Sequence, residues 1–148
     1  MDCVLCSDEL SPVLADGGLW RLVLNRNQNV VGKCMLVTHR HVERVDQLTA
    51  AEWDDLRRQL AQATAGLRQA TRPDHFNYAF LQNQDRHVHL HVIPRYATPR
   101  QIAGLRIDDR DYPDHYAIPA PDRRLTREQG EHLAALLRAA LADCGQND

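Results

Sequence analysis

The sequence predicts an α+β fold, because three patterns occur together along its 148 residues. Short apolar runs typical of strands are separated by polar turns, two of these runs are close enough to form an antiparallel hairpin, and two helical segments stand apart from them. No internal repeat and no Gly/Ser-rich linker divides the chain. We therefore predict one domain over residues 1–148, with a core over about 3–96, an irregular segment over 97–122 and a C-terminal helix over 126–143.

Four segments have the aliphatic and β-branched composition of strands. In chain order they are residues 19–24, 33–38, 76–81 and 87–93. The polar stretch 83–85 between the last two is short, which predicts that these two strands pair as an antiparallel hairpin.

Both predicted helices begin at a capping box, in which a threonine is followed three residues later by Glu or Gln. Thr49 and Glu52 begin the first helix, and the proline-containing run 72–74 ends it. Its apolar residues at helical spacing are Trp53, Leu56, Leu60, Ala63 and Leu67. Thr126 and Gln129 begin the second helix in the same way.

The composition excludes several classes of protein. A formal charge of −2 argues against a broad, non-specific nucleic-acid binder. The first ten residues lack the basic and apolar regions of a signal peptide, and no apolar run approaches the roughly 18 residues that span a bilayer. We therefore expect a cytoplasmic protein with no membrane or nucleic-acid partner, whose four cysteines are reduced or bind a metal rather than form disulfides.

Three histidines alternate with aliphatic residues in the last predicted strand. Val88 and Leu90 separate His87, His89 and His91, so we expect the three imidazoles on one face of the strand and the aliphatic side chains in the core. A single buried histidine is usually a core residue with satisfied hydrogen bonds, but three at a period of two have no packing advantage over apolar residues. The pattern therefore indicates a functional site.

Two chemistries compete for this histidine cluster. A metal site built from all three is geometrically poor, because the outer two Cα atoms lie about 13 Å apart on a strand, whereas zinc needs ring nitrogens at about 2.0 to 2.1 Å. Two neighbouring histidines could still share an ion. Nucleophilic attack on phosphorus needs one neutral imidazole with hydrogen-bonding neighbours, and the ordinary histidine pKa near 6.5 leaves a large neutral fraction at neutral pH. The nucleophile is the favoured interpretation.

The segment from His87 to Arg95, HVHLHVIPR, resembles the signature of the histidine-triad superfamily. Upstream, residues 24–26 (LNR), 30–37 (VVGKCMLV) and 42–48 (VERVDQL) resemble the N-terminal half of the fragile-histidine-triad branch. The resemblance covers roughly residues 3–96. It implies an antiparallel sheet with two main helices, a nucleotide substrate and a homodimer.

The resemblance also implies roles for individual residues. His89, the middle histidine, would be the nucleophile that forms a nucleotidyl-histidine intermediate, with His91 assisting at the phosphates and His87 as a catalytic neighbour. Asn25 falls where the family places an asparagine that contacts the ribose, although an ordinary turn residue is an equally good interpretation.

The segment before the histidines departs from the pattern of the family. Many members carry Gly-Gln-Ser/Thr there, with the glutamine four residues ahead of the first histidine, whereas this chain has NQDR. Asn83 or Gln84 could still hydrogen-bond a phosphate or a leaving group, but Asp85 adds a negative charge beside an anionic substrate unless it points away or is paired. Arg95 and Arg100 are either phosphate contacts or solvated surface charges.

Cys3 and Cys6 form a C-x-x-C pair near the N-terminus. The pair resembles the two early cysteines that, in several histidine-triad proteins, join two histidines around a structural zinc. On that pattern His41 and His87 complete a Cys2His2 set, with His39 as the alternative to His41. The competing interpretation is two reduced cysteines in a flexible tail; a redox role is less favoured, because the pair does not lie within a βαβ unit. No catalytic metal or organic cofactor is expected.

The sequence thus predicts a nucleotide hydrolase that acts on dinucleoside polyphosphates, such as diadenosine tetraphosphate, through a covalent intermediate. A nucleotidyltransferase or phosphorylase would share that intermediate, and a non-catalytic module could use the histidines only to bind phosphate. The intact histidine triplet argues against the non-catalytic alternative, whereas the altered segment over 83–86 argues for it.

Overall fold

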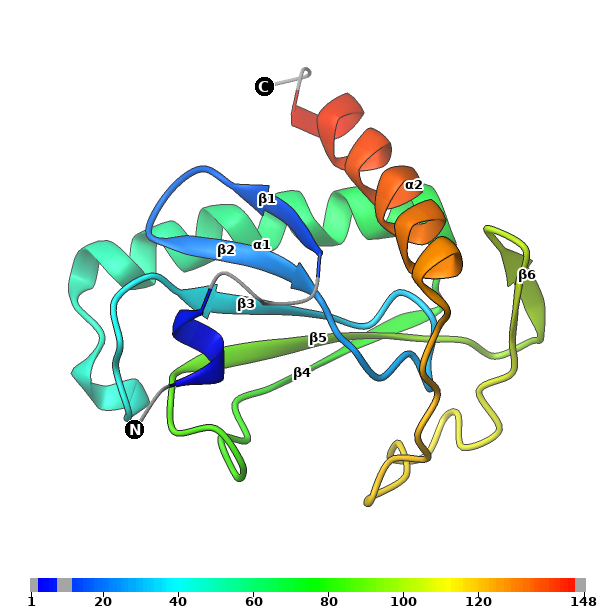
Figure 1. Cartoon of the computed structure of the whole chain (residues 1–148), viewed down its shortest axis with the longest axis horizontal. Coiled ribbons are helices and arrows are strands. Elements are labelled where there is room, and N and C mark those ends of the chain that lie inside the picture. Colours follow the sequence, from blue (N-terminus) through cyan, green and yellow to red (C-terminus); the bar gives the residue numbers. More distant parts are fainter. Residues whose placement is uncertain (1–2, 8–11, 146–148) are drawn as a thin grey trace.

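A five-stranded antiparallel sheet carries the other elements, with its strands in the order β1-β2-β3-β5-β4 (Figure 1). The computed structural model describes residues 3–7 and 12–145, so residues 1–2, 8–11 and 146–148 of the predicted domain lie outside the described residues. The strands of the sheet are β1 (Val13–Asp16), β2 (Trp20–Leu24), β3 (Cys34–Thr38), β4 (His75–Ala79) and β5 (His89–Arg95). The other elements are helices α1 (Ala50–Thr71) and α2 (Arg127–Gly145), the hairpin strands β6 (Arg100–Ile102) and β7 (Leu105–Ile107), and the 3₁₀ turns η1 (Val4–Cys6) and η2 (Val45–Gln47). The predicted α+β class is confirmed.

The first two predicted strands, 19–24 and 33–38, correspond to β2 and β3 and are each one residue too long. The third, 76–81, is displaced slightly from β4, which pairs with β5 in the predicted antiparallel hairpin. β1 is not among the predicted strands, because its four residues include one buried side chain, Leu14, and no alternation of apolar and polar residues.

The fourth predicted strand, 87–93, is wrong at both ends, since β5 runs over His89–Arg95. Its expected start instead contacts the loop after β3, where the backbone N–H of Val88 donates to the carbonyl of Val42 at 2.7 Å. The expectation that all three histidines belong to one strand is corrected accordingly. Only the second and third do.

Both predicted helix starts are confirmed. In α1, the hydroxyl of Thr49 accepts from the N–H of Glu52 at 3.2 Å, and the carboxylate of Glu52 accepts from the N–H of Thr49 at 2.8 Å. Thr126 and Gln129 make the equivalent two bonds at α2, at 3.1 and 3.0 Å respectively. α1 ends before Arg72, whose positive φ of 49° stops the helix one residue ahead of a proline. No helix in the described part of the chain combines the length and apolar character that a bilayer crossing requires.

The two faces of the sheet are used differently. One face packs against both helices, and α1 runs behind β1 and β2 in Figure 1. Its core includes Leu22, Leu36, Leu90 and Val92 from the sheet, Leu56 and Leu67 from α1, and Leu133 and Leu137 from α2. The helices approach so closely that a Cβ at Gly66 would lie 2.6 Å from the side chain of Leu141. The α-helices therefore cover only one face of the sheet.

The opposite face carries the histidines. There η1 inserts Leu5 against Val23 and Val37, which form a separate small apolar cluster. Val37 is the cross-strand partner of His89. Met35, which shares the face of Val37 on β3, is the cross-strand partner of His91. His89 and His91 therefore lie on the face of the sheet that η1 covers, away from the helical layer. Figure 1 shows η1 in front of the sheet and α1 behind it.

The segment over 97–122, expected to be irregular, contains the β6–β7 hairpin. Ala103 and Gly104 form its turn with φ values of 51° and 75°. Positive φ at both central residues is the geometry that closes a two-residue hairpin, and glycine adopts it without strain. The strands have three residues each, which is too short for a recognisable alternation in the sequence.

A buried ion pair joins β5 to the chain that follows this hairpin. The Nε of Arg95 donates to Asp109 at 2.7 Å, and the two side chains are 2% and 3% exposed. The guanidinium also donates to the side chain of Asn77 at 2.7 Å and to the carbonyl of Asp114 at 2.9 Å. Arg95 is therefore neither a surface charge nor an open phosphate contact.

We expect Asp109→Asn to lower the free energy of unfolding by about 3 kcal/mol, because the guanidinium of Arg95 would stay buried without its counter-ion. Urea denaturation followed by circular dichroism measures the loss. Asp108→Asn is the matched control, because that neighbouring carboxylate faces the largely exposed Arg110. Equal losses in the two variants would contradict the expectation.

Candidate functional site

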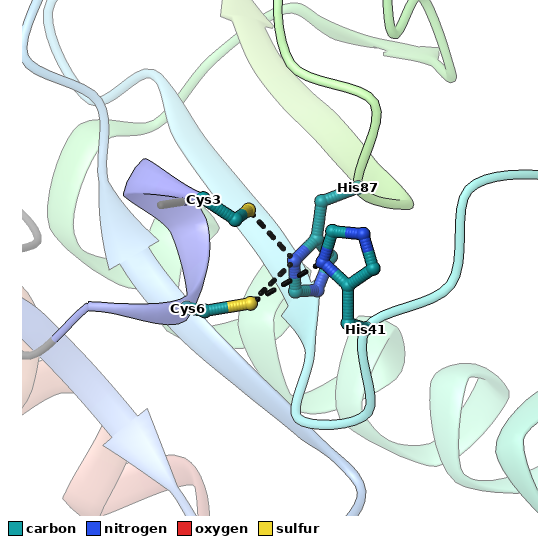
Figure 2. Close-up of side chains that lie close together, drawn as sticks. All are labelled: Cys3, Cys6, His41 and His87. Atoms are coloured by element: carbon teal, nitrogen blue, oxygen red, sulfur yellow. Dashed lines mark hydrogen bonds between the residues drawn. The ribbon is translucent and has the colours of Figure 1, made fainter. Parts of the chain in front are cut away.

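Four side chains that are distant in the sequence converge at η1. Cys3 and Cys6 come from η1 and its N-terminal flank, His41 from the loop after β3, and His87 from the residues just before β5 (Figure 2). Their four ligand atoms all lie within 4.8 Å of one another. The sulfur atoms lie 3.3 to 3.4 Å from the Nδ1 atoms that face them.

These separations fit a tetrahedral ion. Zinc–sulfur bonds of about 2.3 Å and zinc–nitrogen bonds of about 2.0 to 2.1 Å, at tetrahedral angles, place sulfur and nitrogen roughly 3.5 Å apart. Of the two histidines considered as the partner of the cysteines, His41 lies in the cluster and His39 does not. His39 points to Asp16, with 2.6 Å between its Nε2 and the carboxylate, whereas His41 joins the cysteines.

The protonation of His87 matches the requirement of a ligand. Its Nε2 lies 2.8 Å from the carbonyl of Thr38, and a carbonyl can only accept, so Nε2 carries the proton and Nδ1 presents a lone pair to the sulfurs. The hydroxyl of Thr38 lies 3.0 Å from the same Nε2. Burial lowers the pKa of His87, which favours the neutral ring that binds metals.

The two thiols add a further argument for a cation. Burial and the neighbouring Cys3 raise the pKa of Cys6, because two thiolates at this spacing repel each other, while the charge of Arg21 acts in the opposite direction. A bound dication would remove the repulsion and hold both sulfurs as thiolates. Arg21 also fixes η1, since its guanidinium donates to the carbonyl of Leu5 at 2.5 Å.

His89 lies next to this cluster and is oriented by it. Its Nδ1 lies 2.7 Å from the carbonyl of His87, so Nδ1 carries the proton and Nε2 is left with the lone pair. His89 is buried, and its ring meets that of His91 edge-on with the centroids 4.9 Å apart. The arrangement gives the middle histidine the tautomer that a nucleophile needs.

His91 is half-buried and neutral at physiological pH. Burial, followed by the charges of His89 and Lys33, lowers its pKa to about 4. A neutral ring can donate one hydrogen bond and accept another. Its other cross-strand partner, Ala79, lines a cavity of about 400 Å³ that also includes Tyr78 and Tyr116. No triad histidine is among the lining residues, so the cavity reaches the site only through Ala79.

Lys33, whose charge acts on the pKa of His91, is not among the residues predicted from the sequence. It lies just before β3, is 8% exposed, and its burial lowers its pKa to about 8. A signal was present, because Lys33 is the one lysine of a chain with 17 arginines. The sequence alone does not reveal its meaning, because only the fold shows that this lysine is buried.

The roles predicted from the sequence for Asn25, Asn83 and Gln84 remain predictions. The side-chain oxygen of Asn25 accepts from the N–H of Asn27 at 3.0 Å, which is the behaviour of a turn residue. Asn25 also lines a cavity of about 330 Å³ between the end of β2 and the start of α2, and no triad histidine is among the lining residues. Asn83 and Gln84 are exposed in the loop between β4 and β5.

Comparison with known proteins agrees with the fold. The model of a family described as HIT domain matches residues 11–98. A hypothetical histidine triad nucleotide-binding protein from Sulfolobus tokodaii is 15% identical, with a TM-score of 0.74 over 95% of this chain and 93% of that chain. A histidine triad protein from Marinobacter aquaeolei is 21% identical, with a TM-score of 0.73 over 90% of each chain.

A third similar structure contains a metal. It is a zinc-bound histidine triad family protein from Mycobacterium smegmatis, 16% identical, with a TM-score of 0.64 over 93% of this chain and 90% of that chain. No curated protein matches the sequence. At these identities the structural matches establish the fold alone.

Proposed function

Because this chain belongs to the HIT domain family, we propose that it is a nucleotide hydrolase that works through a nucleotidyl-histidine intermediate. The proposed substrates are dinucleoside polyphosphates such as diadenosine tetraphosphate, as in the fragile-histidine-triad branch that its sequence resembles. The observation that carries the proposal is the 2.7 Å contact between His89 Nδ1 and the carbonyl of His87, which leaves Nε2 unprotonated.

The reaction has two displacements at the α-phosphorus. In the first, the lone pair of His89 Nε2 forms a P–N bond, and the P–O bond to the leaving polyphosphate breaks with its electron pair on the departing oxygen. In the second, a water oxygen forms a P–O bond while the P–N bond breaks, the electron pair returns to Nε2, and the proton of the water passes to solvent. The proton stays on Nδ1 throughout and donates to the carbonyl of His87, and this hydrogen bond stabilises the positively charged ring while Nε2 is bonded to phosphorus.

The neighbouring residues have supporting roles in this proposal. His91 hydrogen-bonds the phosphates, Asn25 contacts the ribose, and Asn83 or Gln84 contacts the phosphate or the leaving group. The cavity of about 400 Å³ is lined by Ala79, the cross-strand partner of His91, and lies on the side of β5 where β4 pairs.

We also propose that the Cys2His2 cluster holds a structural zinc. Cys3, Cys6, His41 and His87 would supply the four ligands, a closed set with no open position for substrate. The ion would fix η1 and the backbone of His87, and through that backbone the ring of His89. The role of His87 is then to bind the metal and to position the nucleophile.

The proposed assembly is a cytoplasmic homodimer of one-domain subunits. β4 is an edge strand, and Tyr78 on β4 and Leu81 just after it are 47% and 43% exposed. An unpaired edge with exposed apolar side chains supports pairing with a second copy.

Covalent trapping tests the function. Protein is mixed for milliseconds with diadenosine tetraphosphate labelled at the α-phosphorus and is then quenched in alkali, where a phosphoramidate survives. We expect label on the protein at His89, released by mild acid, and AMP as the product. A folded protein that binds the dinucleotide but neither acquires label nor releases product would favour the non-catalytic binding module. AMP replaced by ADP when phosphate is added would favour a phosphorylase.

A further inference from the structure

The chain places its one lysine in the histidine site. Among 18 cationic residues, 17 are arginines, and Lys33 is 8% exposed. Burying an ammonium is costly unless an anion or several acceptors compensate the charge. The position of Lys33 therefore needs an explanation beyond packing.

The register of the sheet, extended by one residue, places Lys33 diagonally opposite His91. Met35 pairs with His91 and Cys34 pairs with Val92, so the position before Cys34 shares the face of Met35 and His91. The charge of Lys33 is the third cause of the lowered pKa of His91, after burial and the charge of His89, which agrees with this placement. The charged groups that act on the pKa of His91 are His89 and Lys33.

The ammonium has donors to spare. One of its three N–H groups donates to Asn29 Oδ1 at 2.6 Å. Within residues 3–7 and 12–145, no carboxylate forms an ion pair with Lys33. The buried guanidinium of Arg95, by contrast, is paired with the carboxylate of Asp109. A buried cation with two donors left over fits an anionic ligand.

We propose that Lys33 binds the phosphate chain of the nucleotide beside His91, with its ammonium donating hydrogen bonds to non-bridging phosphate oxygens. The inference rests on the proposed function, because the anion is the substrate that His89 attacks. The phosphate supplies the counter-charge and the acceptors that the described residues do not. A lysine suits this position because its compact ammonium can approach one phosphate as a point charge, whereas a planar guanidinium requires a wider, two-pronged contact.

A single lysine makes the test direct. Protein labelled with ¹³C at lysine Cε gives one lysine side-chain resonance, which is titrated in the free protein, with adenosine and with AMP. In the free protein we expect a midpoint near pH 8. AMP should raise it to about pH 9 or above, because the phosphate stabilises the charged form, whereas adenosine should leave it unchanged.

Calorimetry on variants gives a second readout. We expect Lys33→Gln to weaken AMP binding at least about tenfold and to leave adenosine binding unchanged. Arg110→Gln is the matched control, because it removes one charge from a side chain that is 86% exposed. AMP binding with an unmoved lysine resonance would overturn the inference and leave the proposed function standing. Failure of the unmodified protein to bind any nucleotide would overturn both.

Discussion

Replacing His89 with alanine or asparagine is expected to lower the turnover of diadenosine tetraphosphate by about 10⁴-fold or more, because no other group then forms the P–N bond. The Nε2 lone pair on this ring is the nucleophile of the proposed reaction, and the carbonyl of His87 holds its tautomer. Product formation followed by anion-exchange chromatography measures the loss.

The control for this variant is binding. The apolar cluster under η1 and the core under the helices do not depend on the ring of His89, so AMP affinity and the circular dichroism spectrum should persist. His132→Asn is a matched substitution at an exposed position on α2, and it should keep full turnover. Turnover by His89→Ala at an undiminished rate would remove the nucleophile assignment.

Loss of one metal ligand is expected to have the second largest effect. Cys6→Ser should abolish stoichiometric zinc binding and lower the melting temperature by about 10 °C. Zinc at a free concentration of about a thousand times its Kd adds about 4 kcal/mol to the free energy of unfolding. Each kcal/mol shifts the melting temperature of a chain of this size by about 2–4 °C. Elemental analysis and differential scanning calorimetry measure the two quantities.

Cys144→Ser is the matched control, because that thiol lies on α2 and contacts Gln69 rather than the cluster. It should retain one zinc per chain and the melting temperature of the unmodified protein. Chelator treatment of the unmodified protein should reproduce the effect of Cys6→Ser. If the purified protein contains zinc in the Cys6→Ser variant at the original stoichiometry, the ligand set is wrong.

The features that the sequence predicts well are those with a local cause. The capping boxes at Thr49 and Thr126 are each satisfied by residues three positions away, and both helices begin there. The alternation that places His89 and His91 opposite the aliphatic core residues is also local, because it follows from the geometry of one strand.

The features that the sequence does not predict depend on contacts between distant residues. The first histidine leaves the strand because Val88 bonds to Val42 across the molecule. Arg95 is buried because Asp109 returns to it from beyond the β6–β7 hairpin. The pairing of His39 with Asp16, which leaves His41 for the cysteines, likewise involves residues 23 positions apart. No periodicity along the chain encodes such partners.

The group that accepts the hydrogen bond from Nδ1 of His89 is a main-chain oxygen, that of His87. A substitution at position 87 removes the imidazole ring but keeps the main-chain oxygen. It would therefore change the affinity for the proposed metal and leave the tautomer of His89 unchanged. The tautomer of the proposed nucleophile thus depends on the path of the main chain and not on any one side chain. A relative of this protein that lacked the proposed metal ligands would still have a correctly protonated imidazole at the position of His89.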